Sequence, residues 1–230
     1  LKNKEFPKIS IIYPIHNEKP DILDDVLLKA KECLDLIPNL EAIVVDDGSD
    51  NIAELEKVYD EYRSDNLKIF YKNNSGKRET QYFGFQIAKG EYIITVDSDT
   101  LINVDGIYTL LYMMLTHDNM GAVTGEVRVE NKDHNLLTTL VNYRYWLAFN
   151  LERAAQSFTG TMLCCAGPFS IYRKDIIDQV KEGYINQTFL GKRCTYGDDR
   201  HLTNLVLAQC YYTGYQHDAI CTTYAPTIIG

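Results

Sequence analysis

The stretches EAIVVDDGS (41–49) and EYIITVDSDT (91–100) share one pattern, in which a short apolar run passes directly into paired acids. The second stretch supplies Asp97 and Asp99. Short runs that are rich in β-branched residues and bounded by turn residues are typical of buried strands. The apolar runs EAIVV (41–45) and EYIITV (91–96) are therefore predicted strands, and the carboxylates directly follow them.

Two further runs of this kind, KISIIYP (8–14) and LKIFY (67–71), are also predicted strands. Amphipathic stretches with apolar residues at helical spacing separate the four strands, near 21–36, 52–63 and 77–89. Strand and helix that alternate at this interval imply parallel pairing and a covered sheet. The expected fold class is α/β, a Rossmann-like, mostly parallel sheet with helices on both faces.

The pattern changes after residue 100, where longer and less regular segments follow. The predicted elements are a helix at 104–118, a strand with a glycine kink at 121–130, a helix at 134–157, a strand over 162–173 broken at Gly167-Pro168, helices at 174–182 and 199–209, and a strand around 215–222. No repeat and no linker rich in Pro, Gly or Ser divides the chain. One domain over 1–230 is expected.

Composition excludes several classes of protein. The chain has 23 Lys and Arg against 32 Asp and Glu, a net charge of −9, which makes it a poor partner for nucleic acid or anionic lipid. The longest near-apolar run, 107–115, is far shorter than the about 20 residues that a bilayer span needs. Six cysteines without a CxxC pair favour free thiols.

The acids at the strand ends indicate a site. Ligands of open parallel sheets bind beyond the carboxyl ends of the strands. Several carboxylates at one edge repel each other unless a cation neutralises them, and oxygen ligands suit Mg²⁺ or Mn²⁺. Each acidic segment alone could be only a turn or a helix cap. Because both pairs follow correctly ordered strands, the functional interpretation is favoured.

A third acidic cluster, Gly197-Asp198-Asp199-Arg200-His201, opens a predicted helix. A carboxylate there could accept a proton from an attacking hydroxyl, although acids at a helix N-terminus are also favoured by the dipole. GxGxxG, GxxxxGK[ST], HExxH and GxSxG patterns are absent from the sequence. The acids, rather than a phosphate loop or a nucleophilic serine, are therefore the candidate chemistry.

In this order, the segments resemble the family-2 glycosyltransferases with the GT-A fold. The matching segments, which extend over nearly the whole chain, are YPIHNE (13–18), VDDGS (45–49), SGKRE (75–79), VDSDT (96–100), AGPFSIYR (166–173) and GDDRHLTN (197–204). The resemblance is strongest to processive, membrane-embedded synthases of hyaluronan, chitin or chitin-oligosaccharide. NLERAAQSFTG (150–160) and YINQTFLGKRCTYGDDRHLTN (184–204) favour hyaluronan synthase, and chitin-oligosaccharide synthases tend to carry Glu-Asp in place of Asp198-Asp199.

The resemblance implies roles for matching residues. On the donor side, the uridine would be held by Tyr13, Glu18 and Asp47, with Lys77 on the nucleotide, and Asp97 would touch the ribose or diphosphate and join Asp99 at a metal. On the acceptor side, Asp199 would be the base, and the acceptor would be bordered by Cys165, Gly167 and Pro168. Three further residues would lie close to the base: Asp198, Arg200 and Cys194. The implied cofactor is Mg²⁺ or Mn²⁺. The donors would be UDP-GlcNAc and UDP-glucuronic acid, the acceptor a polysaccharide or monosaccharide, and the transfer inverting.

The same resemblance implies a longer protein. The family's Gln-x-x-Arg-Trp motif and its transmembrane helices are not found in this sequence, which ends in TYAPTIIG (223–230). The expectation is a catalytic domain at the cytosolic face of the plasma membrane, with a nucleotide-binding half (1–100) and an acceptor-binding half (101–230). A synthase that uses UDP-GlcNAc alone and a nucleotide-sugar-binding module without catalysis stay open as alternatives.

Secondary features carry weaker expectations. Trp146, Tyr143, Tyr145 and Phe149 recur at helical spacing, which favours core packing over sugar stacking. Among the five histidines, His16 and His201 are expected to border the site.

Overall fold

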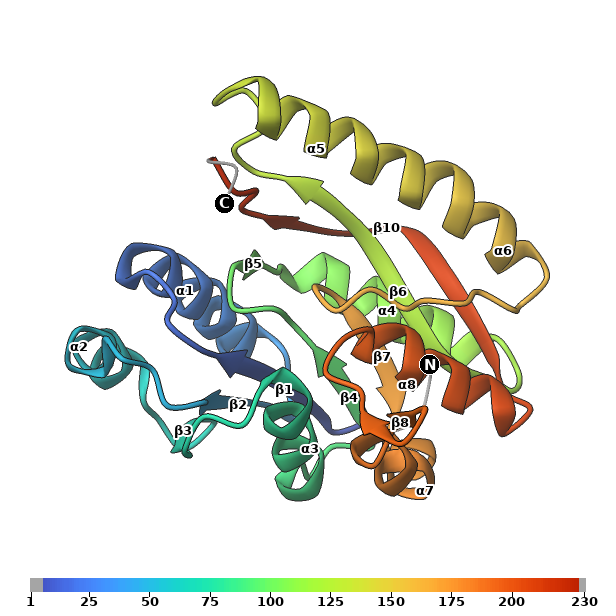
Figure 1. Ribbon diagram of the computed structural model, residues 1–230, viewed down its shortest axis with the longest axis horizontal. Helices are drawn as coiled ribbons and strands as arrows, with labels where there is room; N and C mark the ends of the chain where they lie inside the picture. The colour runs from blue at the N-terminus through green and yellow to red at the C-terminus, as the bar shows by residue number, and fades with distance from the viewer. Residues whose placement is uncertain (1–5, 228–230) are drawn as a thin grey trace.

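An eight-stranded sheet, in the order β3-β2-β1-β4-β7-β6-β10-β5, forms the centre of the computed structural model, which describes residues 6–227 (Figure 1). Its strands are β1 (Ile9–Ile15), β2 (Leu40–Asp46), β3 (Leu67–Tyr71), β4 (Tyr92–Thr95), β5 (Thr100–Leu101), β6 (Met120–Val129), β7 (Ser170–Arg173) and β10 (Tyr212–Thr223). Both halves of the chain contribute strands to this sheet. The predicted α/β fold class is confirmed.

The helices cover the two faces of the sheet (Figure 1). They are α1 (Pro20–Leu36), α2 (Ile52–Tyr62), α3 (Lys77–Ile87), α4 (Val104–Thr116), α5 (Leu136–Leu147), the π-helical turn η1 (Ala148–Arg153), α6 (Ala154–Phe158), α7 (Lys174–Ile185) and α8 (Asp198–Ala208). In the part of the chain that the structure describes, none of these helices combines the length and apolarity needed to cross a bilayer.

The sheet is mostly parallel, as predicted, and two of its strands run antiparallel to their neighbours. β7 runs antiparallel to both β4 and β6, and β5 runs antiparallel to β10. The predicted strand over 162–173 is shortened to β7, because the segment before it leaves the sheet as a loop. A small hairpin of β8 (Thr188–Phe189) and β9 (Lys192–Arg193), which the sequence pattern did not indicate, precedes α8.

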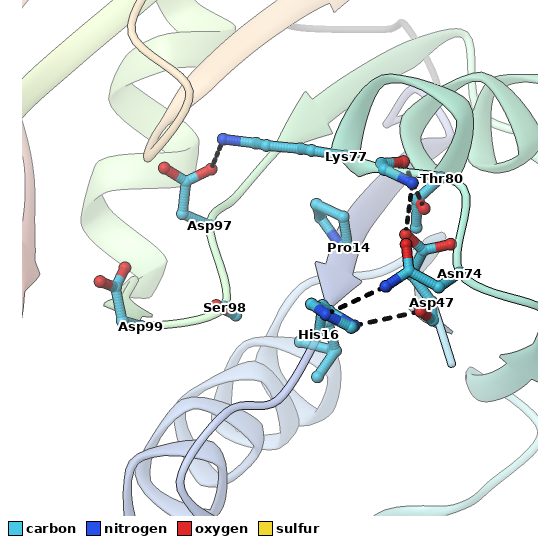
Figure 2. A pocket seen from close by; sticks show the side chains of 11 residues that line it. Pro14, His16, Asp47, Asn74, Lys77, Thr80, Asp97, Ser98 and Asp99 are labelled. Carbon is cyan, nitrogen blue, oxygen red and sulfur yellow. Dashed lines mark hydrogen bonds and ion pairs between the residues drawn. The ribbon is translucent and has the colours of Figure 1, made fainter. Parts of the chain in front are cut away.

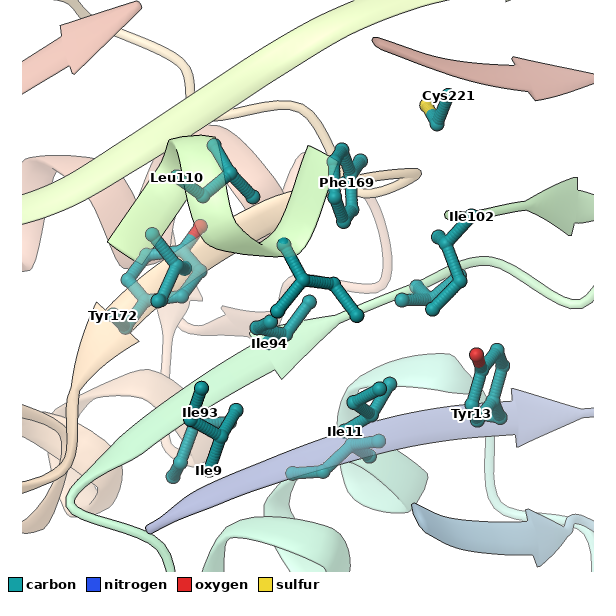
Figure 3. Packing of buried hydrophobic residues seen from close by; sticks show 14 of the residues in the cluster. Ile9, Ile11, Tyr13, Ile93, Ile94, Ile102, Leu110, Phe169, Tyr172 and Cys221 are labelled. Atoms are coloured by element: carbon teal, nitrogen blue, oxygen red, sulfur yellow. The ribbon is translucent and has the colours of Figure 1, made fainter. Parts of the chain in front are cut away.

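Parallel register brings the acidic strand ends together. Ile15 pairs with Asp46, and Ile12 pairs with Thr95, so the ends of β1, β2 and β4 lie at one edge. Ile9, Ile11 and Tyr13 project to one face of β1 and pack with β4 and β7 residues in the core (Figure 3). Burial of both faces explains why these strands are almost continuously apolar.

The α5–α6 helix corrects one expectation. Tyr143 and Trp146, predicted to be core residues, have exposed fractions of 62% and 59%. Phe149 is buried and Tyr145 packs in an edge-to-face pair with it, so only these two follow the prediction.

Gly84 sets the distance between α3 and β1. A methyl group at this position would lie 2.6 Å from Cγ2 of the buried Ile12. We expect Gly84→Ala to lower the free energy of unfolding by about 1 kcal/mol, because overpacking outweighs the gain in helix propensity. Urea unfolding of the chain measures this change.

Gly183→Ala in α7 is the matched control, because its nearest neighbour would be 3.7 Å away. It should raise the free energy of unfolding by about 0.5–1 kcal/mol. Equal effects of the same sign at both positions would contradict this account of the α3–β1 contact.

Candidate active site

A cavity of about 420 Å³ opens at the carboxyl ends of β1, β2 and β4 (Figure 2). It is lined by Pro14, Ile15, His16, Asp47, Asn74, Gly76, Lys77, Thr80, Asp97, Ser98 and Asp99. The structure thus brings together four predicted site residues, Asp47, Lys77, Asp97 and Asp99, from three separate segments. The position beyond the strand ends is the one that the sequence indicated.

Asp47 is held by the loop that follows β3. Its carboxylate accepts hydrogen bonds from the backbone N–H groups of Ser75 (3.0 Å) and Gly76 (2.7 Å) and from Nζ of Lys72 (2.7 Å). Burial alone would raise the pKa of Asp47, but the Lys72 ammonium and the two N–H donors outweigh it and lower the pKa. Asp47 is therefore a fixed negative charge in the cavity wall.

Asp46, its neighbour, has a structural role. The buried carboxylate accepts bonds from the backbone N–H and the hydroxyl of Ser49, both at 2.9 Å, and from the Tyr59 hydroxyl at 2.9 Å. The alternative interpretation as a turn thus holds for the first aspartate of the pair. Asp47 differs from Asp46 in that it also lines the cavity.

Asp97 and Asp99 face the same cavity in different surroundings. Nζ of Lys77 lies 2.5 Å from Asp97, whereas Asp99 accepts a 3.0 Å bond from the hydroxyl of Thr223 (Figure 2 shows the first pair). Burial, and then the nearby charge of Asp97, raise the pKa of Asp99. The second carboxylate is thus costly to ionise in the protein alone.

This donor set fits a divalent cation. Two carboxylates next to an open cavity, the second of which has a raised pKa, would be stabilised by a double positive charge. No cluster of three or more His, Cys, Asp or Glu that could hold a metal occurs within residues 6–227. Mg²⁺ and Mn²⁺ suit such a site, because they are bound by few carboxylates and keep positions for water and phosphate.

Glu18 lies beside this cavity and does not line it. Its carboxylate accepts a 2.6 Å bond from the hydroxyl of Ser98, and it borders a neighbouring hollow that also reaches Asp99. Glu18 therefore fixes the loop between the two predicted metal ligands.

A second cavity, of about 370 Å³, shares Asp97 with the first. Its other lining residues are Val127, Arg144, Tyr145, Ala148, Phe149, Arg153, Cys164, Ala166, Gly167, Pro168 and Asp199. Gly167 fits between the acids so closely that a methyl group there would lie 2.8 Å from Asp199 and 3.1 Å from Asp97. The two cavities thus meet at Asp97, and Asp199 lies in the second of them.

Asp199 has the properties of a general base. Its Oδ2 accepts a 3.0 Å hydrogen bond from the backbone N–H of Gly167. Removal from water raises its pKa to about 6, with Lys77 opposing the shift and Asp97 adding to it. A carboxylate with a pKa close to neutrality is a stronger proton acceptor than an ordinary aspartate, yet it is ionised at pH 7.

Two predicted substrate contacts are corrected to core residues. The side chain of Tyr13 is fully buried and lies with the apolar residues of Figure 3. Pro14 and His16, on the opposite face, line the cavity instead. Cys165 is likewise fully buried, and its neighbour Cys164 takes the place at the second cavity.

Three further predicted residues lie outside both cavities. Asp198 points toward Arg78, with 3.9 Å between their charged groups. Arg200 is exposed on α8, and Cys194 lies in a separate hollow on the β8–β9 hairpin. Neighbours of Asp199 in sequence are therefore not its neighbours in the cavity.

Several lining residues were missed by the sequence prediction. In the first cavity they are Pro14, Ile15, Asn74, Gly76, Thr80 and Ser98. His16, expected near the site, lies 3.1 Å from the carbonyl oxygen of Asp47 through Nδ1 (Figure 2). Arg144 and Arg153 of the second cavity carry no local signal, since folding alone brings the α5–η1 helix to the acids.

Comparison with known proteins identifies the family. The model of the family described as glycosyl transferase family 2 matches residues 10–181. An "N-acetylglucosaminyltransferase" of Azorhizobium caulinodans is 38% identical over 223 residues, which are 96% of this chain and 55% of the relative. One from Neorhizobium galegae is 38% identical over 226 residues, 97% of this chain and 52% of the relative. The chain thus spans about half the length of these curated relatives.

A solved structure supports the fold. The mannosyltransferase PcManGT of Pyrobaculum calidifontis, in complex with GDP-Man and Mn²⁺, superposes with a TM-score of 0.69 over 97% of this chain and 58% of its own, at 18% identity. At this identity the likeness shows the fold alone. The family match and the relatives carry the assignment: this chain belongs to glycosyl transferase family 2.

Proposed function

We propose that this domain transfers N-acetylglucosamine from UDP-GlcNAc, with inversion, to a hydroxyl group of a β-linked sugar chain. The observation that carries the proposal is that two cavities share Asp97, and that Asp199 lines the second of them. The first cavity is suited to bind a nucleotide diphosphate, and the second contains a candidate general base. The names of the relatives support the choice of sugar.

The first cavity is the proposed donor site. Asp47 and Asn74 offer an acceptor and a donor for the uracil edge, and the Lys77 ammonium offers a charge to the diphosphate. Asp97 and Asp99 would hold Mg²⁺ or Mn²⁺. When bound, the ion stabilises the negative charge that develops on the leaving diphosphate.

The second cavity is the proposed acceptor site. Asp199 takes the proton of the acceptor hydroxyl while its oxygen forms the new bond to the anomeric carbon. The bond from that carbon to the diphosphate oxygen breaks, and UDP leaves. Attack from the face opposite the leaving group inverts the carbon, so an α-linked donor gives a β-linkage. The N–H of Gly167 keeps the Asp199 carboxylate oriented.

Hyaluronan synthesis is the second candidate. It is favoured by the Asp198-Asp199 pair and by the 150–160 and 184–204 segments, and it would require UDP-glucuronic acid as an additional donor. Calorimetric titration with UDP-GlcNAc, UDP-glucuronic acid and UDP-glucose, each with and without Mn²⁺, tests both. Mn²⁺-dependent binding of UDP-GlcNAc alone supports the first proposal. Mn²⁺-dependent binding of both UDP-GlcNAc and UDP-glucuronic acid supports the second. Absence of any Mn²⁺-dependent binding would refute both.

A nucleotide-sugar-binding module without catalysis is the non-enzymatic alternative. It would bind donor but give no transfer in the full-length protein. The second cavity argues against it, because a binding module has no need of a base with a raised pKa beside its ligand.

We also propose that the domain works at the cytosolic face of a membrane as part of a longer protein. The resemblance to membrane-embedded synthases and the greater length of the relatives support this. Fractionation of cells that express the full-length protein tests it, and recovery of all transferase activity in the soluble fraction would refute it.

The pH dependence of transfer should follow Asp199. The pKa of about 6 means that the carboxylate form, which accepts the proton, is lost as the pH falls through 6. Below that point kcat/KM should drop about tenfold for each pH unit, whereas an ordinary aspartate would sustain activity down to about pH 4. A pH profile of kcat/KM with no inflection between pH 5 and 7 would contradict this role, with the range set by the pKa of about 6.

A further inference from the structure

Arg78 is a buried cation that makes no contact in the proposed reaction. It lies in the first turn of α3, directly after Lys77, and is only 4% exposed. A guanidinium is costly to bury unless its N–H groups find partners. The partners of Arg78 all lie on elements more than 100 residues away in sequence.

The guanidinium joins three segments. Its Nη1 lies 2.8 Å from the carbonyl oxygen of Tyr184, in the last turn of α7, and 3.0 Å from Nδ1 of His201 in α8. Its Nη2 lies 3.4 Å from the carbonyl oxygen of Tyr196, just before α8, and 3.9 Å from the carboxylate of Asp198. Since the last carbonyls of a helix lack intrahelical partners, Arg78 also caps α7.

Aromatic stacking reinforces this arrangement. The guanidinium carbon lies 5.0 Å from the centre of the Tyr184 ring, which stacks on the His201 ring at 6.0 Å and 21°. The Tyr184 hydroxyl donates a 2.5 Å bond to Gln81, one turn after Arg78 on α3. The first turn of α3 and that of α8 are thus fixed through one buried cluster.

The cluster also fixes the tautomer of His201. Arginine is a donor only, so Nδ1 of His201 must accept and the ring must carry its proton on Nε2. Burial and the Arg78 charge lower the pKa of His201, which keeps the ring neutral. The tautomer of His201 can therefore be checked by spectroscopy, without a measurement of catalysis.

We propose that Arg78 is a positioning residue that fixes the first turn of α8, and with it the Asp199 carboxylate, against the turn of α3 that carries Lys77. Asp198 and His201, which flank Asp199 on that turn, both face Arg78. On the other side of the same α3 turn, Lys77 reaches Asp97. This inference rests on the proposed function, because it concerns the base of the proposed transfer.

Arg78→Lys in the full-length enzyme is the test. Lysine keeps the charge but cannot serve several acceptors with one planar group. Because small displacements of a reacting group are costly, kcat should fall about 30- to 100-fold, whereas KM for the donor changes less than about threefold. Tyr82→Phe is the matched control, since it removes a 2.6 Å bond between α3 and Glu182 of α7 at the surface, away from α8.

A double-mutant cycle separates positioning from general stability. In an Asp199→Asn background, Arg78→Lys should cause no further loss of the residual transfer, because the group that Arg78 positions is already gone. Equal losses in both backgrounds, or loss with Tyr82→Phe equal to that with Arg78→Lys, would overturn the proposal.

Nitrogen NMR of the histidines in the 230-residue chain gives a second measurement that needs no activity. His201 should show the Nε2–H tautomer in the parent chain, and a proton on Nδ1 would overturn the inference even if Arg78→Lys failed to fold. The two proposals fail differently. An enzyme inactive with every nucleotide sugar refutes the function, whereas an active enzyme with a normal kcat for Arg78→Lys refutes only the positioning role.

Discussion

Asp199→Asn is expected to lower kcat for sugar transfer by about 10²- to 10⁴-fold, because the acceptor hydroxyl loses its general base. Donor binding should be unchanged, since Asp199 lines only the second cavity. Asparagine has the same shape, and its side-chain oxygen can still accept the hydrogen bond from Gly167. Turnover in the full-length enzyme and calorimetry with UDP-GlcNAc measure the two quantities.

The same substitution should stabilise the chain above pH 6. The folded pKa of Asp199, about 6, lies above its ordinary value, so the folded state binds the proton more tightly than the unfolded state does. The cost of ionising Asp199 therefore appears as pH rises from about 4 to 6 and is constant above that range. Asparagine removes this cost, so we expect the free energy of unfolding to rise by about 1–2 kcal/mol at pH 7 and to be unchanged near pH 4.

Asp218→Asn, which changes an exposed acid on β10, is the control for both measurements. It should alter neither kcat nor the pH dependence of unfolding. Normal turnover by Asp199→Asn would show that Asp199 is not the general base. A loss of donor affinity would show that Asp199 contributes to donor binding rather than to the acceptor site alone.

Asp99→Asn is expected to abolish the Mn²⁺ dependence of nucleotide binding. Its carboxylate is one of two in the first cavity that could hold the ion, and the Thr223 hydroxyl orients it. Since the loss of even an outer-shell partner typically costs 10- to 100-fold in metal affinity, losing a ligand should weaken UDP binding in Mn²⁺ by about 100-fold or more. Metal-free binding should stay at the parent value.

Calorimetry with UDP, with Mn²⁺ and with a chelator, measures this difference. Asp105→Asn, which removes an exposed negative charge in the first turn of α4, is the control for the change of charge. If Mn²⁺ strengthens UDP binding equally in Asp99→Asn and in the parent chain, Asp99 is not a metal ligand.

Much of the fold could be predicted from local patterns. β3 begins and ends at the predicted residues, and the bounds of β1, β2 and β4 differ from the prediction by one residue or two. Helices α2 and α3 also begin where the periodicity indicated. Hydrophobic period and turn residues are properties of neighbouring residues, so they can be read without knowing the rest of the fold.

The side chains that enter a cavity were harder to predict. Motif matching selected Tyr13 and Cys165, but Pro14 and Cys164 line the cavities. In an extended segment, adjacent residues point to opposite sides, so an error of one position exchanges a cavity residue for a core residue. Which side faces the ligand depends on where α3 and the other helices pack.

The sequence by itself determined the α/β pattern and the placing of carboxylates directly after two strands, because both follow from residues within a few positions of one another. Only the tertiary structure decided that Asp99 meets Thr223, that Arg78 meets His201, and that Asp97 and Asp199 share a cavity. Those partners lie about 100 or more residues apart in the chain. Their contacts depend on strand order, on the antiparallel insertion of β7, and on helix packing, none of which has a local signal.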